Sequence, residues 1–114
     1  MANFFAKKTK CVHGHTHDSK REAARCAELH LLFRAGVIDA LVYQPQYWFV
    51  IDGETVKHSN GRRVGYKADF SYLEGGKVIV EDVKPTNGYA SRDVPLRMAI
   101  FQHLHRDVEL RVVT

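Results

Sequence analysis

The sequence VGYKADFSYLEGGKVIVEDVKP, residues 64–85, decides the fold class because it has the pattern of two strands joined by a tight turn. Aromatic and β-branched residues fill 64–73 and 77–84, and the run EGG at 74–76 separates them. Such residues favour strands, and a short connection containing glycine favours a β-hairpin. The segment therefore predicts an antiparallel β-hairpin.

The second strand of this hairpin ends in charged residues, although its first half is apolar. Side chains alternate along a strand, so Asp82 and Lys84 share one face. If the strands pair through the glycine turn, Asp69 lies beside Asp82, within one register step. Adjacent acids repel unless a cation joins them, and two carboxylates with a lysine suit a divalent metal acting on a phosphate. Taken alone, the D-x-K spacing of Asp82 and Lys84 has an alternative explanation, a simple ion pair at the end of a strand.

Glu81 lies on the opposite face of a regular strand from Asp82. It is expected either to face solvent there or to pair with a base such as Lys67. A β-bulge near Pro85 would bring Glu81 into the site in place of Asp82. The choice between these two acids as metal ligand depends on one register step.

Glu22 is the third candidate acid. A helix is predicted over residues 19–35, and at about 100° per residue Glu22 lies within roughly 40° of Cys26, at the head of an apolar stripe that continues through Leu29 and Phe33. An acid on a core-facing stripe is unusual unless a cation or a donor meets it. The spacing from Ser19 also fits an S-x-x-E capping box, and the two roles are compatible.

The remaining elements complete a mixed fold. Gly36 is a natural residue to follow the first helix, and the second helix is expected to carry Leu96, Ile100, His103 and Leu104 at helical spacing. That order of helices and strands predicts an α/β (α+β) fold with a mixed central sheet flanked by helices. The predicted elements are a helix at 19–35, strands at 42–51, 64–73 and 77–84, a helix at 93–105 and a strand at 107–113, in the order α-β-β-β-α-β.

Length and composition fit one folded domain over residues 1–114, with 1–17 as a basic, histidine-rich N-terminal arm or short hairpin. The chain has 17 Lys and Arg against 13 Asp and Glu, and a basic small domain often binds nucleic acid. No apolar run is long enough to cross a membrane, and no signal peptide is evident, so a cytoplasmic protein is expected.

Glu22, Asp69 and the run Asp82-Val83-Lys84 together resemble the PD-(D/E)xK nuclease pattern. The runs AKKT…HGHTHDSKREAARCAELHLLFRAGVIDALVYQPQYWFV and YKADFSYLEGGKVIVEDVKP also resemble a phage- and prophage-borne family of small domains long labelled as of unknown function. That family is commonly grouped with phage endonuclease I, the Holliday-junction-resolving enzyme. DSKREA and EDVKP carry the resemblance, which implies a restriction-endonuclease-like core.

The resemblance implies hydrolysis of phosphodiester bonds in DNA with Mg²⁺ or Mn²⁺. Asp69 and Asp82 would bind the principal ion, helped by the Val83 carbonyl. Glu22 would ligate a second ion or its water, and Lys84 would orient the attacking water. Relatives in the superfamily that cut both strands are generally dimers, so a homodimer acting on branched or duplex DNA is expected.

Several positions stand apart from this core set. Gln44 matches a family glutamine and is expected to hydrogen-bond near the site. Ala68 replaces the proline of the superfamily name, His17 replaces an aromatic residue, and Arg97 stands where lysine is common. These departures leave the acid–acid–lysine set intact.

Basic residues outside the acidic set are expected to bind DNA phosphates. They lie in the N-terminal arm, in the polar loop 52–63 and around the second helix. The predicted DNA-binding residues are Lys7, Lys8, Lys10, Lys57, Arg62, Arg63, Arg92 and Arg97.

Two other functions compete with a nuclease. A DNA-binding or phage assembly protein would keep a nuclease fold without catalysis. A zinc-stabilised module would use Cys11, His13, His15 and His17, which alternate along the arm, with Cys26. That spacing fits no standard zinc finger, because ligands on one face of a strand span too far for one tetrahedron. A DNA-facing arm that gains charge as pH falls is favoured for these histidines.

Overall fold

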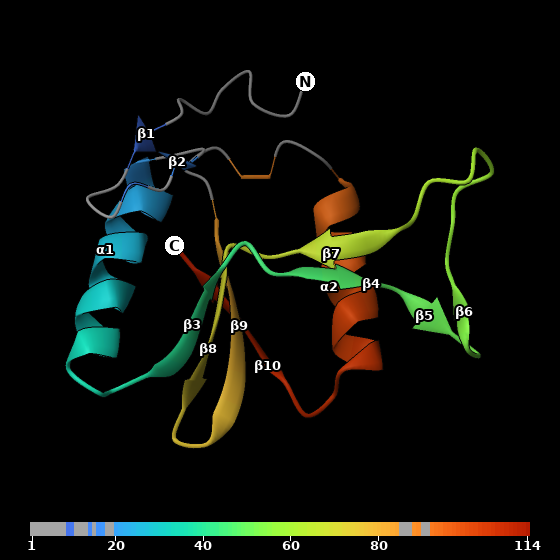
Figure 1. Ribbon diagram of the computed structural model, residues 1–114. Helices are drawn as coiled ribbons and strands as arrows, with labels where there is room; N and C mark the ends of the chain where they lie inside the picture. The colour runs from blue at the N-terminus through green and yellow to red at the C-terminus, as the bar shows by residue number, and fades with distance from the viewer. Residues whose placement is uncertain (1–8, 11–13, 15, 18–19, 85–87, 90–91) are drawn as a thin grey trace.

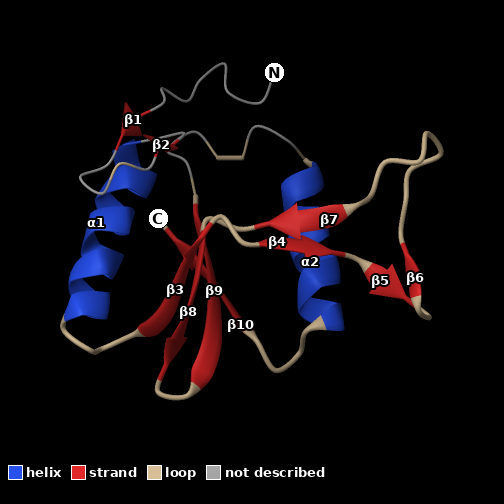
Figure 2. Ribbon diagram, viewed as in Figure 1, coloured by secondary structure: helices blue, strands red, loops and turns tan. Residues whose placement is uncertain are grey.

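The structure is a computed structural model that describes the chain except residues 1–8, 11–13, 15, 18–19, 85–87 and 90–91. Two helices and several short strands surround one four-stranded sheet (Figures 1 and 2). The elements are β1 (Thr9–Lys10), β2 (Thr16–His17), α1 (Lys20–Arg34), β3 (Asp39–Tyr43), β4 (Gln46–Trp48), β5 (Val50–Ile51), β6 (Glu54–Thr55), β7 (Gly65–Lys67), β8 (Phe70–Glu74), β9 (Lys77–Val83), α2 (Asp93–Leu104) and β10 (Glu109–Val113).

The main sheet has the strand order β10-β9-β8-β3. β8 pairs antiparallel with both β9 and β3, whereas β10 returns after α2 to pair parallel with β9. The sheet is therefore mixed, and α1 and α2 lie on either side of it (Figure 2). The prediction of a mixed α+β fold with helices flanking the sheet is confirmed.

The predicted hairpin is present, with Glu74 paired to Lys77 across a two-residue turn. Gly75 and Gly76 have φ values of 59° and 80°, which a type I′ turn requires and glycine adopts without steric cost. The N-terminal pair β1–β2 is also antiparallel, which confirms the short hairpin predicted there.

The two long strands predicted before and within the hairpin are each broken. Residues 42–51 contain parts of β3, β4 and β5, and residues 64–73 contain β7 and most of β8. The breaks coincide: the Gln44 N–H donates to the Asp69 carbonyl at 2.8 Å, and the Ala68 N–H donates to the Pro45 carbonyl at 3.1 Å. Gln44 has a φ of 51°, uncommon for a residue other than glycine, so the backbone turns sharply here. β4 and β7 consequently leave the main sheet as a separate pair.

α1 ends where the sequence predicts. The Gly36 N–H bonds to the Phe33 carbonyl at 3.1 Å and the Val37 N–H to the Leu32 carbonyl at 2.9 Å, with Gly36 at a φ of 78°. This pair of bonds is a Schellman motif, which satisfies the last carbonyls of the helix. Phe33, predicted on the buried stripe, is instead 44% exposed, and Leu32 packs against the core. At its C-terminal end, α1 therefore contacts the hydrophobic core through Leu32 rather than through Phe33.

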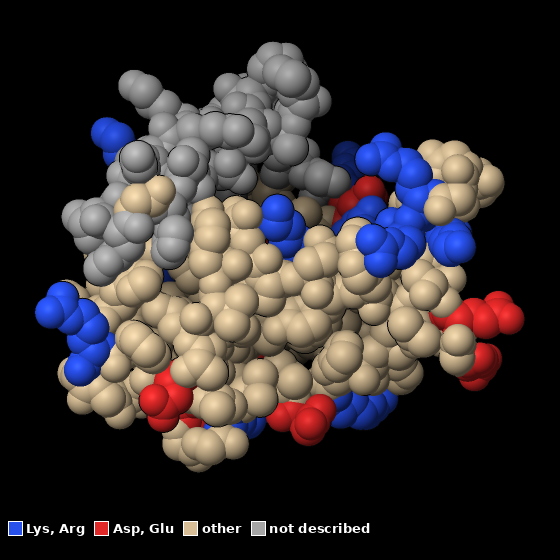
Figure 3. Space-filling model, in the orientation of Figure 1, with Lys and Arg blue, Asp and Glu red and all other residues tan. Residues whose placement is uncertain are grey.

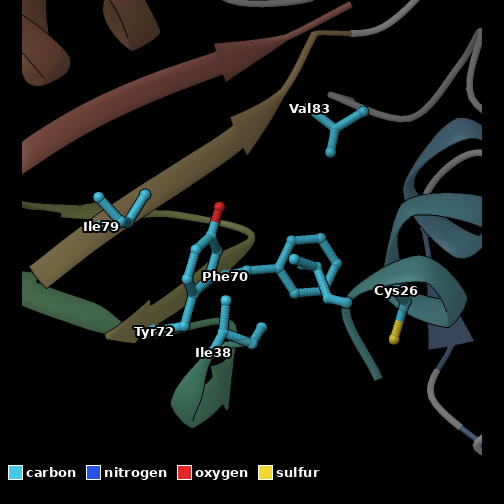
Figure 4. Close-up of a cluster of buried hydrophobic side chains, with 7 residues drawn as sticks. Cys26, Ile38, Phe70, Tyr72, Ile79 and Val83 are labelled. Atoms are coloured by element: carbon cyan, nitrogen blue, oxygen red, sulfur yellow. The ribbon is translucent and has the colours of Figure 1, made fainter. Parts of the chain in front are cut away.

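Two hydrophobic clusters cover the two faces of the sheet. The first joins α1 to one face (Figure 4) and consists of Cys26, Leu29, Ile38, Phe70, Tyr72, Ile79 and Val83. The second joins α2 to the other face and to β4–β7, and consists of Phe49, Tyr66, Ala68, Val80, Met98 and Phe101. Neighbouring residues of β9 thus enter different cores, as strand alternation requires.

The buried face of α2 differs from the predicted one. Met98 and Phe101 are its buried residues, whereas Leu96 is 60% exposed and His103 is also exposed. Ile100 and Leu104 are half-buried against the second cluster. The apolar residues of this helix surround most of its circumference, so their spacing alone did not identify the face that packs.

Residues 49–64 extend from the body as two successive short β-hairpins (Figure 1). β5 and β6 pair through Asp52 and Gly53, and a bridge between Lys57 and Arg63 closes the second hairpin. The polar segment 52–63 therefore lies at the end of the β4–β7 pair. Neither helix within the described part of the chain is long and apolar enough to cross a membrane.

Candidate metal centre

The hairpin strands β8 and β9 separate at Asp69. The last bond of their ladder joins the Asp69 N–H to the Glu81 carbonyl at 3.2 Å, and the chain before Asp69 then turns away into β7. On its other side β9 continues to pair with β10, and the Lys84 N–H bonds to the Val113 carbonyl at 2.8 Å. The end of β9 is therefore paired on one side and opens on the other, where β8 has left.

Asp69 and Asp82 occupy this gap. Phe70 pairs with Glu81, so the same register sets Asp69 opposite Asp82 on one face. The Asp69 carboxylate fills the position of the missing strand, because its Oδ2 accepts the Val83 N–H at 2.7 Å. The register thus brings together the two aspartates that the sequence singled out.

Both carboxyl groups are held in an environment that disfavours their charged forms. Burial, followed by the charge of Glu22, raises the pKa of Asp69 from 3.8 to about 7. Burial, followed by the charge of Asp69, raises the pKa of Asp82 from 3.8 to about 8. Around neutral pH the pair therefore shares at least one proton, and a bound cation would displace it.

Glu22 contributes to this centre from the first turn of α1. Its side chain is only 5% exposed, and it acts on Asp69 both through its charge and through side-chain hydrogen bonding. The acid that heads the α1 stripe therefore meets the end of the hairpin, as the helical spacing predicted.

Two tyrosine hydroxyls complete the surroundings of Asp82. Tyr66 of β7 and Tyr89, which follows β9, lie close enough to lower the pKa of Asp82. Neither buried hydroxyl, however, has a hydrogen-bond partner of standard geometry in the described part of the chain. Buried hydroxyls without partners are costly, so a ligand or water between them and Asp82 would satisfy both.

These features fit a divalent cation. Within the described residues, no three Asp, Glu, His or Cys side chains already form a complete metal-binding group. Magnesium, however, ordinarily takes one or two protein carboxylates and fills its other positions with water and substrate phosphate. The Asp69–Asp82 pair supplies that number of carboxylates, and the unpartnered Tyr66 and Tyr89 hydroxyls mark polar space beside it.

Glu81 has a different environment from its neighbour Asp82. It is fully buried, and Arg25 of α1 holds it through two hydrogen bonds, from Nε at 2.7 Å and from Nη2 at 2.9 Å. The Tyr72 hydroxyl donates to the same carboxylate at 2.6 Å. The partner is therefore Arg25 rather than the predicted Lys67, whose residue is exposed. Glu81 is bound by Arg25 of α1 and pairs with Phe70 in the sheet. Asp82 is therefore the acid that lies beside Asp69.

The other predicted site residues lie around the pair. Lys84 directly follows β9 and is exposed; the alternation of the strand sets it on the face of Asp82. Gln44 is half-buried, and its described contact is the backbone bond to Asp69. The Val83 N–H orients the Asp69 carboxylate, and the metal-binding role that the resemblance implies for the Val83 carbonyl stays a prediction.

The predicted DNA-binding residues lie in three places: the chain between β6 and β7, the region of α2, and the N-terminal segment, of which the structure describes only part. Figure 3 shows Lys and Arg side chains gathered where the chain from β6 returns to β7. Lys57, Arg62 and Arg63 are exposed there, and Arg63 stacks on Trp48 with its guanidinium carbon 4.1 Å from the ring centroid. At α2, Arg92 is exposed and Arg97 is half-buried. Lys7 and Lys8 lie outside the described residues, and only the strand placement of Lys10 is described.

Three of the cysteine and histidine residues proposed as zinc ligands, Cys11, His13 and His15, lie outside the residues that the structure describes. His17 is placed only as part of β2. Cys26 is buried in the first hydrophobic cluster.

Sequence reasoning missed three residues of this region. Arg25 gave no signal because an arginine on a helix ordinarily faces solvent. Tyr66 and Tyr89 could have been suspected, since each lies within seven residues of Asp69 or Asp82 along the chain.

Comparison with protein families gives one match. The family described as protein of unknown function (DUF1064) matches residues 1–114, so the chain belongs to that family. No match was found among curated proteins or among solved structures.

Proposed function

We propose that this protein is a metal-dependent endonuclease of the PD-(D/E)xK type that hydrolyses phosphodiester bonds in DNA. The observation that carries the proposal is the Asp69–Asp82 pair at the end of β9, in which Asp82 is buried and Asp69 half-buried, with two unpartnered tyrosine hydroxyls beside it. Adjacent acids with raised pKa values are typical of functional sites, because a bound cation relieves their repulsion. The proposed cofactor is Mg²⁺ or Mn²⁺.

The chain's own groups would divide the work. Asp69 and Asp82 would hold the ion, and the Val83 N–H fixes the orientation of the Asp69 carboxylate. Glu22 would add negative charge on the α1 side of the ion and take part in holding a second one. The ion would supply Lewis-acid polarisation of the scissile phosphate.

Lys84 would act on the phosphate and the attacking water. It is exposed directly after the acidic strand, so its ammonium group can reach a substrate that lies over the pair. A cation at this position would orient the water and offset charge that develops on the phosphate oxygens. Gln44 would hold the Asp69 backbone through the sharp turn that opens the gap.

DNA is the proposed substrate because exposed cations lie on the same molecule as the acidic centre. Lys57, Arg62 and Arg63 on the second hairpin would contact phosphates at a distance from the cut, which suits branched DNA such as a Holliday junction more than a short linear duplex. A homodimer would present two such centres to the two strands.

The proposal is tested by incubating supercoiled plasmid, and labelled linear and four-way-branched DNA, with the protein and Mg²⁺ or Mn²⁺. Nicking that is lost in Lys84→Ala and Asp82→Asn supports the assignment. Glu28→Gln, which alters an exposed acid on the far face of α1, serves as the matched control and should cut normally. Equal cutting by all variants would show that the reaction does not use this centre.

One observation favours a second candidate, a DNA-binding or phage assembly protein without catalysis. The described residues lack a complete three-ligand metal group, while the exposed basic hairpin would bind DNA without any metal. Protein that shifts DNA but never cuts it with any divalent ion would favour this candidate.

A further inference from the structure

A pocket of about 280 Å³ lies between the β4–β7 pair and the start of α2. Tyr66 is common to the pocket and the acidic pair, because it belongs to the pocket lining and its hydroxyl interacts with Asp82. A molecule in the pocket would therefore have Tyr66 between it and the acidic pair. The lining residues are Gln46, Trp48, Gly65, Tyr66, Lys67, Val94 and Arg97.

The pocket is built for an anion at one side. Lys67 and Arg97 are its two charged residues, and the part of the chain that the structure describes contributes no acid to its lining. Arg97 is fixed in place, because its Nη1 donates to the Gly65 carbonyl at 2.7 Å. One of its donors is used in this way, and the others stay available for a phosphate.

The other side of the pocket offers an aromatic surface. Trp48 is 40% exposed, and Arg63 covers part of its ring. Trp48 lines the pocket, whereas Arg63 does not. The indole is also held closely against Gly65, where a Cβ atom would lie 3.0 Å from the ring and 2.3 Å from the Tyr47 carbonyl oxygen. The absence of a side chain at Gly65 lets the indole pack in this position.

We propose that this pocket binds one unpaired nucleotide of a DNA strand, with the base against Trp48 and a phosphate on Lys67 and Arg97. Aromatic surfaces combined with cations are the usual means of binding single-stranded nucleic acid. A base within a duplex is stacked on both faces and cannot enter a pocket of this kind. The volume lies just below the roughly 300 Å³ at which small-molecule sites begin, which suits one nucleotide.

This inference rests on the proposed function and names the substrate class of the same site. An unpaired nucleotide held beside Tyr66 would bring its neighbouring phosphate to Asp69 and Asp82. Selectivity for branched DNA would then come from the unpaired nucleotides that branch points supply.

Trp48 is the single tryptophan of the chain, so its fluorescence reports directly on the pocket. The experiment titrates the full chain in EDTA, which prevents cutting, with a short oligothymidylate, a blunt hairpin duplex or inorganic polyphosphate. Oligothymidylate should quench the emission saturably, and the other two should quench it far less. Anisotropy of labelled oligothymidylate then gives the affinity of variants.

Lys67→Gln should weaken binding of the single strand about five- to tenfold, and Trp48→Leu about tenfold or more. Arg34→Gln removes an equal charge at the exposed end of α1 and should bind as the parent does. Quenching by polyphosphate equal to that by oligothymidylate, or equal affinities of Lys67→Gln and Arg34→Gln, would overturn the proposal. Quenching without plasmid nicking would refute the nuclease alone, whereas nicking without quenching would refute the nucleotide pocket alone.

Discussion

Replacing Asp82 by asparagine should stabilise the metal-free protein, and should do so more strongly as the pH rises. The wild-type pair carries one buried acid, Asp82, and one half-buried acid, Asp69, and the fold opposes the ionisation of both. An asparagine keeps the shape of the side chain and removes one of the two titrations. The variant would lose its proposed catalytic function and gain stability, a combination expected of a residue kept for a ligand.

The size of the effect follows from the pKa of Asp82, about 8 in the fold against 3.8 as its ordinary value. Because the folded pKa is raised, this carboxyl contributes most stability below about pH 4, and that contribution is lost as the pH rises towards 8. Each pH unit in this window is worth about 1.4 kcal/mol. Between pH 5.5 and 8 the free-energy difference between Asp82→Asn and wild type should therefore grow by about 3 kcal/mol.

The assay is urea unfolding in EDTA at constant ionic strength, followed by circular dichroism at several pH values from 5.5 to 8.5. Asp107→Asn, which alters an exposed aspartate after α2, is the matched control and should run parallel to wild type. Comparing variants with wild type at each pH removes the contribution of the seven histidines. Parallel profiles for Asp82→Asn and wild type would refute the description of Asp69 and Asp82 as an interacting pair with raised pKa values.

A divalent ion should reverse this pH dependence. Because an ion binds the ionised pair, Mn²⁺ should raise the unfolding free energy of wild type more at pH 8 than at pH 6. A concentration about 100 times the dissociation constant adds about 2.7 kcal/mol. Asp82→Asn should gain little from the ion at either pH, and an equal gain in both proteins would place the ion elsewhere.

Three further predictions concern single positions. Arg25→Ala leaves Glu81 buried without its cation and should cost about 3–5 kcal/mol in unfolding free energy, part of which Glu81→Gln should restore when added to it. Gly65→Ala should cost about 3 kcal/mol or more, because the new Cβ would meet the Tyr47 backbone oxygen, whereas Gly36→Ala should cost only about 1 kcal/mol for its left-handed backbone. Lys84→Ala, at an exposed position, should lower the nicking rate about a hundredfold or more without changing the unfolding midpoint.

The elements with strong local signals were predictable from the sequence. The β8–β9 hairpin followed from its glycine turn, and α1 from its helical spacing and from Gly36. The sequence predicted Asp69 beside Asp82 only to within one register step, and the two-residue turn of the structure fixes the register that pairs them.

The breaks in the strands were not predictable in the same way. Residues 42–51 and 64–73 have uniform strand propensity, and Pro45 suggested only an edge or a strand start. The bend depends on two bonds between segments about 25 residues apart, from Gln44 to Asp69 and from Ala68 to Pro45. Strand propensity is a property of one segment, whereas this bend depends on hydrogen bonds between two segments. The propensity of neither segment therefore predicts the bend.

The contrast between Glu81 and Asp82 is the strongest reason to regard one of them as functional. Both are buried acids, adjacent in β9, and strand alternation sends them to opposite faces. Glu81 receives a bidentate arginine and a tyrosine hydroxyl, which is how a fold neutralises a buried charge. Asp82 faces another carboxyl group and two hydroxyls without partners, and no cation pairs with it within the described chain. Since this fold neutralises one buried acid fully, the acid that it leaves uncompensated is the one for which we propose a partner from outside the chain.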